Sequence, residues 1–163
     1  MRRFGTLTII VTMMVATCTA QDCPQCQLKK FYNQYLELNC PPQGEYPDTE
    51  AVRQLLKQHL TPKLYDAWEA SHDAESDHWI DYDMFIQGQD CWPGIRIKDM
   101  AHIEGTEWYE ILITQDGADN ADRRVFFHLE PVNGRWLIGC IDDGHNRLGQ
   151  APDKTYELLK SKY

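Results

Sequence analysis

Residues 125–140, VFFHLEPVNGRWLIGC, consist of two alternating runs on either side of Asn133-Gly134. Alternate positions of each run are apolar and predict one buried face per strand: Val125, Phe127 and Leu129 in the first, Trp136, Ile138 and Cys140 in the second. Asn-Gly between two such runs is a strong signal for a two-residue β-hairpin. This stretch therefore predicts two antiparallel strands.

Two further alternating runs precede the hairpin. Their apolar positions are Ile95, Ile97, Ala101 and Ile103, and then Tyr109, Ile111 and Ile113. An acidic loop over residues 116–122 connects the second run to the hairpin. We expect an antiparallel sheet of about four strands, followed by a short helix over residues 153–160.

Helical periodicity dominates the sequence before the sheet. Apolar residues recur at helical spacing from Gln25 to Leu38 and again from about Glu50 to His59. A third helix is expected to start at Thr61-Pro62, with Thr as the N-cap. Helices that precede an antiparallel sheet define an α+β fold, with the N-terminal helices packed on one face of a curved sheet.

The first twenty residues have the pattern of a secretory signal peptide. Arg2 and Arg3 precede a short apolar run, and small residues lead to Ala20, after which cleavage is expected. A bacterial lipoprotein signal acylated at Cys18 is the alternative, but Thr17 directly before that cysteine fits it poorly. We therefore expect a periplasmic or secreted protein without stable membrane insertion, in which residues 21–163 form a single domain.

The expected mature chain is strongly acidic. Only Arg2 and Arg3 leave with the signal, so fourteen of the sixteen basic residues remain against all 25 acidic ones, a net charge of −11. Such a charge repels phosphate backbones and anionic lipid surfaces, which excludes nucleic acid as a partner.

Five cysteines follow the signal, and an exported protein meets oxidising conditions. An unbroken helix from residue 25 to 38 spans roughly 20 Å, too far for Cys40 to reach Cys23 or Cys26. We expect Cys40 to pair with Cys91 if it pairs, a Cys23–Cys26 bridge as the second alternative, and a free Cys140. Cys23-Pro-Gln-Cys26 also has redox CxxC spacing, but its position at the start of the mature chain favours a structural bridge or unpaired thiols.

The densest group of polar and aromatic candidates lies in the connection between the helices and the sheet. Carboxylates, amides and an indole there could line a pocket for a polar ligand: Asp81, Asp83, Gln89, Asp90 and Trp92. The structural alternative is that these side chains cap turns of a long connection. Asp99 falls among apolar positions of the first strand, so it has a partner, lines a cavity or marks a bulge.

No cofactor or metal site is expected. The spacing of Asp73, Glu75 and Asp77 starts like a calcium loop, but His78 and Met84 occupy the positions that need Gly and Glu. Phosphate-binding glycine loops and nucleophile elbows are also missing from the sequence.

The second face of the sheet is unusually apolar for a solvated surface. Trp108 and Phe126 share it with Glu110 and His128. Either the C-terminal segment or a second subunit must cover such a patch, and we expect a weak homodimer through it.

Several motifs resemble a known family: Phe31-Tyr32-x-x-Tyr35-Leu36, Leu60-Thr-Pro-Lys-Leu64-Tyr, and Asp81-Tyr-Asp83-x-Phe85-Ile-x-Gly-Gln89-Asp90. They look like the bacterial exported proteins grouped as domain of unknown function 3828. That family is similar in turn to the nuclear transport factor 2-like superfamily. The resemblance implies a cone-shaped α+β fold with a cavity between helices and sheet, and it carries no catalytic residues over.

Three functions remain open on the sequence. The first is a non-catalytic binding module that holds a small polar ligand, a peptide or an envelope fragment. The second is a small cone-fold enzyme, such as an isomerase, dehydratase or hydrolase, that uses Asp83, Asp90 or Asp99 with His128 as acid and base. The third is an interaction protein that dimerises through its sheet. The absence of a nucleophile, base and orienting residue in one motif favours the binding module.

Overall fold

Three helices form the N-terminal half of the chain. The computed structural model describes residues 23–42, 45–91, 94–116 and 122–150, and the helices are α1 (Pro24–Asn39), α2 (Thr49–His59) and α3 (Pro62–Ser71). The side chain of Asp48 caps α2 by accepting a hydrogen bond from Ala51 N at 3.0 Å, and Thr61 caps α3 through Leu64 N at 3.3 Å. The capped starts agree with the expected helices to within one residue. The expected signal peptide and the helix over 153–160 lie outside the described residues.

The strands form a single antiparallel meander. They are β1 (Arg96–His102), β2 (Trp108–Thr114), β3 (Arg123–Val132), β4 (Arg135–Asp142) and β5 (Arg147–Gly149), and the sheet order follows the chain order. Asn133 and Gly134 both have positive φ between β3 and β4, as a tight hairpin requires. The fold class is confirmed, with one short strand more than expected.

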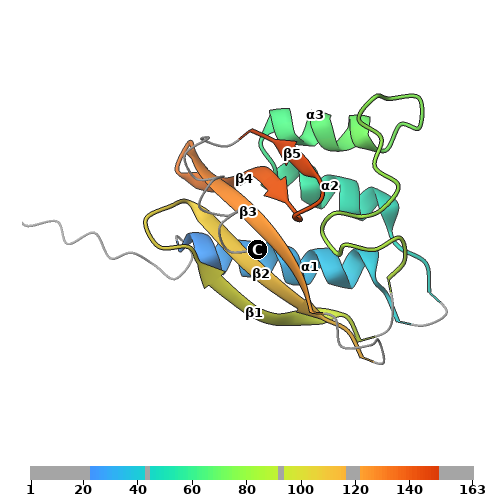
Figure 1. Cartoon of the computed structure of the whole chain (residues 1–163), viewed down its shortest axis with the longest axis horizontal. Coiled ribbons are helices and arrows are strands. Elements are labelled where there is room, and N and C mark those ends of the chain that lie inside the picture. The colour runs from blue at the N-terminus through green and yellow to red at the C-terminus, as the bar shows by residue number, and fades with distance from the viewer. Residues whose placement is uncertain (1–22, 43–44, 92–93, 117–121, 151–163) are drawn as a thin grey trace, which may run out of the picture.

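The helices cover one face of this curved sheet. Helix α1 packs along β1, α2 packs against β4, and α3 packs against β4 and β5 (Figure 1). The core between them contains the apolar faces of all three helices and the inward side chains of β2 and β3. None of the helices in the described ranges is long and apolar enough to cross a membrane.

Two β-bulges change which side chains face this core. The register between β1 and β2 shifts between Ile97 and Asp99, so Met100 pairs with Ile111 and packs against the core. Ala101, expected to face the core, is instead exposed, and so is Asp99. Asp99 therefore marks a bulge, which was one of the three alternatives for it.

The second bulge lies at Gly139 in β4, where His128 pairs with Cys140 but Leu129 pairs with Ile138. Cys140 therefore faces away from the helices, and the prediction that it shares a face with Ile138 is wrong. It packs in a second buried cluster with Trp108 and Phe126.

This second cluster is buried within the single chain. Trp108 is 0% exposed and Phe126 is 1% exposed, and the ring of His128 lies edge-on to Trp108. Glu110, which follows Trp108 on β2 and pairs with Phe126 of β3, is half-buried and 3.2 Å from the guanidinium of Arg124. The exposed patch that motivated the expected homodimer is thus absent from the described surface.

Candidate functional site

A compact loop over residues 83–88 anchors the long connection between α3 and β1. Asp83 and Gly88 exchange backbone hydrogen bonds of 3.0 and 3.3 Å, and Gln87 takes a positive φ to close the turn. The three apolar residues inside the loop, Met84, Phe85 and Ile86, are fully buried in the core. Part of the connection therefore belongs to the hydrophobic core.

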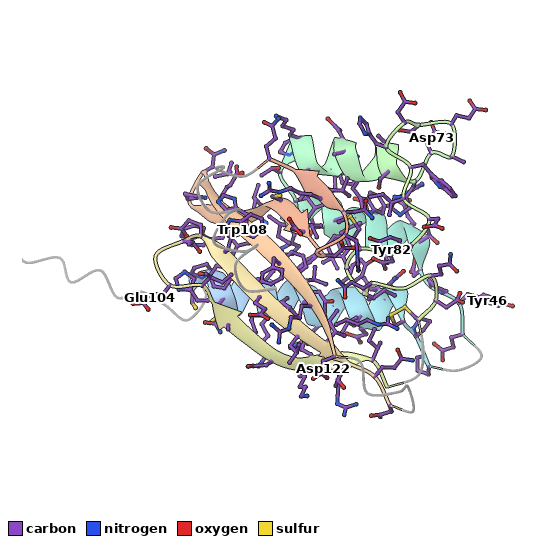
Figure 2. All side chains as sticks on the ribbon, viewed as in Figure 1. Tyr46, Asp73, Tyr82, Glu104, Trp108 and Asp122 are labelled. Atoms are coloured by element: carbon purple, nitrogen blue, oxygen red, sulfur yellow. A yellow bond between two sulfur atoms is a disulfide. The ribbon has the colours of Figure 1, made fainter. Side chains whose placement is uncertain are left out.

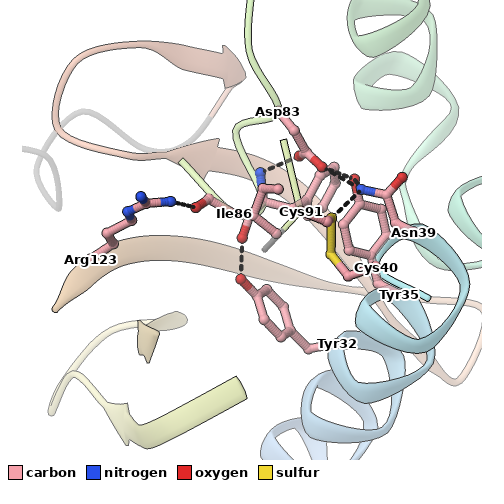
Figure 3. The surroundings of a disulfide bond; sticks show 9 residues. Tyr32, Tyr35, Asn39, Cys40, Asp83, Ile86, Cys91 and Arg123 are labelled. Atoms are coloured by element: carbon pink, nitrogen blue, oxygen red, sulfur yellow. Dashed lines mark hydrogen bonds between the residues drawn. A yellow bond between two sulfur atoms is a disulfide. The ribbon is translucent and has the colours of Figure 1, made fainter. Parts of the chain in front are cut away.

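The carboxylate of Asp83 joins this loop to the end of α1. Its Oδ1 accepts from Phe85 N at 2.8 Å, and its Oδ2 accepts from Tyr35 Oη at 2.5 Å and Asn39 Nδ2 at 2.8 Å (Figure 3). Tyr32 Oη donates to the Phe85 carbonyl from one turn earlier on α1. Both carboxylate oxygens are thus occupied by donors from the chain itself.

A disulfide fixes the same junction, where the C-terminal end of α1 meets the connection between α3 and β1. Cys40, the C-cap of α1, is bonded to Cys91 at the end of the connection, with a Cα–Cα distance of 5.0 Å. This is the first of the two expected pairings. Among the described residues Cys23, Cys26 and Cys140 are free, and Cys140 is buried as expected.

Burial governs the electrostatics of the junction. It raises the pKa of Asp83, although the hydrogen bonds from Tyr35, Phe85 N and Asn39 and the nearby His72 oppose that rise. Burial, followed by the Asp83 charge, also holds the pKa of Tyr35 well above its usual range. Tyr35 therefore stays protonated and acts as a permanent donor to the carboxylate.

Above the junction lies a pocket of about 960 Å³ between the C-terminal half of α1, α2, α3 and the connection. Four of the residues expected to bind a ligand line it: Asp81, Asp83, Gln89 and Asp90. Trp92 lies outside the described residues, and Asp99 lies on β1 away from the described lining. The structure therefore brings four of these residues together in one pocket, and their role in ligand binding stays a prediction.

Tyr82, which lines the pocket, is hydrogen-bonded to the turn between β4 and β5. Tyr82 Oη donates to Asp143 Oδ2 at 2.5 Å and accepts from Asn146 Nδ2 at 2.6 Å. Burial and the bond to Asp143 raise the pKa of Tyr82 to about 12. Gln87 Nε2 donates to the carbonyl oxygens of Asp143 and Arg124, which ties the 83–88 loop to the sheet.

The pocket is strongly acidic. Six carboxyl groups line it against the single guanidinium of Arg53 and the imidazole of His72: Glu45, Glu69, Asp73, Asp81, Asp83 and Asp90. Figure 2 shows Asp73, Tyr82 and Tyr46 at the end of the molecule opposite Glu104. Arg53 is itself 3.9 Å from the carboxylate of Glu69, so the only guanidinium in the described lining is already paired.

Aromatic rings complete the walls. Trp68 of α3 and His72, the C-cap of that helix, have ring centroids 4.5 Å apart, and the exposed Trp79 also lines the pocket. His72 Nδ1 lies 2.8 Å from the Trp68 carbonyl oxygen, which can only accept, so Nδ1 carries a hydrogen in this bond. Nε2 of the imidazole takes no part in this bond.

Sequence reasoning missed the helical half of the pocket. The signal was present as two pairs at i,i+4 spacing, Tyr35 with Asn39 and Trp68 with His72, each of which puts a ring and a polar group on one helix face. Nothing local in the sequence shows that these two faces meet the 81–90 stretch.

The acid–base set expected for an enzyme is not assembled. His128 packs beside Trp108 near the second cluster, Asp99 is exposed on β1, and both oxygens of Asp83 are already hydrogen-bonded. Among the described residues no three His, Cys, Asp or Glu side chains are grouped to hold a metal ion. The described residues thus form an acidic pocket with aromatic walls.

Comparison with known proteins supports the fold. No family model and no curated protein matches the chain. A solved structure of a protein of unknown function from Bacteroides thetaiotaomicron superposes with a TM-score of 0.53 at 17% identity, covering 72% of this chain and 90% of that one. The likeness extends to the fold alone.

Proposed function

We propose that the chain is an exported, non-catalytic binding protein that holds a small, positively charged polar ligand in the pocket between the helices and the 72–91 connection. The observation that carries this proposal is the imbalance of charge in the pocket: six carboxyl groups line it together with one imidazole, and only Glu69 among the six is paired with the guanidinium of Arg53. Low-dielectric walls focus the field of such a cluster and attract cations.

The aromatic walls favour the same ligand class. A cation above the face of an indole gains about 0.5–1 kcal/mol at an exposed site, and Trp68 and Trp79 both line the pocket. A pocket of about 960 Å³ is also in the size range of small-ligand sites. An amine-bearing ligand, such as a polyamine, an amino sugar or a basic side chain of a peptide, meets both requirements.

Export accounts for the disulfide. A Cys40–Cys91 bond persists in oxidising compartments. The N-terminus, basic and then apolar, has the pattern of a signal peptide that directs a chain to such a compartment. The resemblance to the exported domain-of-unknown-function 3828 proteins points to the periplasm of a bacterium.

The test is a titration of the full chain with putrescine, a short diamine, followed by tryptophan fluorescence. Succinate, a dianion of similar length, is the matched ligand control. We expect saturable binding of putrescine only, weakened roughly two- to fivefold in Trp79→Ala by loss of the cation–π contact. Asp81→Asn and Asp90→Asn should also weaken it, since both exposed carboxylates line the pocket.

Glu104→Gln is the matched control variant, because this exposed carboxylate lies at the opposite end of the molecule (Figure 2). If Glu104→Gln weakens putrescine binding as much as Asp81→Asn does, general charge attraction rather than the pocket is responsible. Succinate binding as tightly as putrescine would refute the proposed ligand class.

A further inference from the structure

Cys23 and Cys26 lie together at the start of α1, away from the pocket. Cys23 is the N-cap, Pro24 occupies the first turn, and Cys26 is the third residue of the helix. Helical residues three apart have Cβ atoms about 5–6 Å from each other, about 1–2 Å more than the Cβ–Cβ separation in a disulfide. The helix start therefore holds two thiols within bonding reach after a small adjustment.

Both thiols are accessible and interact with each other. Cys26 is exposed and Cys23 is partly exposed, and their side chains are hydrogen-bonded. Between them, Gln25 Nε2 donates to the carbonyl oxygen of Met100 at 3.2 Å and so fixes this first turn to β1. The pair is thus presented to solvent on a positioned part of the backbone.

The two thiols differ in pKa. The hydrogen bond from Cys26 lowers the pKa of Cys23, and the same bond raises the pKa of Cys26. A thiolate at a helix N-terminus also benefits from the positive end of the helix dipole. Cys23 is therefore the better nucleophile near neutral pH, and Cys26 is placed to attack it afterwards.

We propose that Cys23 and Cys26 form a thiol–disulfide exchange site whose substrate is a solvent-accessible disulfide. The Cys23 thiolate attacks one sulfur of that disulfide, forming a mixed disulfide and releasing the other sulfur as a thiolate. Cys26 then loses its proton to solvent and attacks Cys23 Sγ, which breaks the mixed bond and releases the second substrate sulfur. The substrate disulfide gains two electrons and takes up two protons from solvent to become two thiols, and Cys23–Cys26 becomes a disulfide.

The other cysteines of the described ranges do not compete for this chemistry. Burial raises the pKa of Cys140 to about 11, and the side chain is 0% exposed. Cys40 and Cys91 are already joined and pack against the core. A reductant that opens Cys23–Cys26 should therefore leave Cys40–Cys91 intact.

The experiment exposes the full chain, with its free thiols reduced and Cys40–Cys91 intact, to oxidised glutathione at neutral pH. Acid quenching and peptide mass mapping then locate the products. In the wild type we expect loss of two hydrogens and a Cys23–Cys26 crosslink. Cys26→Ser should accumulate one glutathione on Cys23, and Cys23→Ser should react at Cys26 roughly tenfold more slowly.

Cys140→Ser is the matched control and should exchange like the wild type. Parallel reactions with insulin, a polypeptide with accessible disulfides, distinguish the substrate source. If Cys26→Ser forms the mixed disulfide faster with insulin, the substrate is a polypeptide disulfide. If it forms the mixed disulfide faster with glutathione, the substrate is a small-molecule disulfide. Equal rates for the two single variants, or a wild type that stops at the mixed disulfide, would overturn the proposal.

Discussion

The two ends of helix α1 use the same chemistry in opposite ways. At its C-terminal end Asn39 and Cys40 are bound to Asp83 and Cys91, and the sulfur is locked in a disulfide against the core. At its N-terminal end Cys23 and Cys26 are free and reach solvent. The fixed end shapes the pocket, and the open end leaves its thiols available for reaction.

This contrast shows that the surroundings, more than residue type, decide what a cysteine does. Cys40 and Cys91 are separated by 51 positions, so bonding them restricts a long stretch of the unfolded chain. A bond between Cys23 and Cys26 closes a loop of a few residues and restricts little. The first bond should therefore matter for stability and the second for reactivity.

The largest expected effect comes from removing the fixed sulfur pair. Cys40→Ala with Cys91→Ala should lower the free energy of unfolding by about 4 kcal/mol, the chain-entropy value for a loop of this length. Urea unfolding followed by circular dichroism measures it. The matched variant, Cys23→Ser with Cys26→Ser, should change the free energy by less than about 0.5 kcal/mol. Similar losses in both double variants would remove the distinction between the two ends.

Asp83→Ala should be the next most damaging change. It removes the acceptor of Tyr35 Oη and Asn39 Nδ2 and leaves the buried Tyr35 hydroxyl without its acceptor, which costs about 3 kcal/mol. Chemical denaturation measures the loss, and Asp81→Ala, an exposed carboxylate two residues away, serves as the control with an effect below about 0.5 kcal/mol. A stable Asp83→Ala protein would show that the buried loop 83–88 and the Cys40–Cys91 disulfide hold the fixed end without this carboxylate.

The smallest effect concerns the middle of α1, where His59 of α2 packs on Phe31 with ring centroids 5.2 Å apart. Burial, followed by the charges of Arg135 and Lys30, lowers the pKa of His59 below its usual 6.5. The folded chain therefore binds fewer protons than the unfolded chain just below pH 6.5. The stability contributed by neutral His59 is therefore complete above pH 6.5. It is lost as the pH falls from 6.5 to the pKa of His59 in the folded chain, and the free energy of unfolding decreases over that range.

His59→Gln should flatten the decline in unfolding free energy between pH 7 and pH 5, measured by denaturation at each pH. The exposed His78 on the connection provides the control, and His78→Gln should keep the wild-type slope. A slope unaltered by His59→Gln would mean that other groups, such as the buried His128, cause the decline.

Periodicity predicted the elements of this fold well, and it failed where the period breaks. The caps at Asp48 and Thr61 and the Asn133-Gly134 turn each have a local signature, so the helices and the hairpin were predicted correctly. A bulge shifts the alternation by one residue without changing composition, so Ala101 and Cys140 were assigned to the wrong face. Strand β5 has only three residues, too few to show a period.

The candidate site was half predictable for a different reason. Asp81, Asp83, Gln89 and Asp90 are close in sequence, so their clustering in the pocket could be anticipated. The opposing wall comes from helix faces, and only the packing of α1 and α3 around the connection brings it there. The anchoring role of Asp83 depends on Tyr35, 48 positions earlier in the chain, a pairing that one sequence does not reveal.

The two outer strands of the meander differ from the central ones in how they could meet other molecules. Strand β1 is interrupted by the bulge near Asp99 and exposes Arg96 and Lys98, which pair with acidic side chains 2.6 Å away. Strand β5 offers only three residues. Charged, irregular or very short borders are poor templates for strands of another chain. The folded protein should consequently resist edge-to-edge aggregation even when it is concentrated.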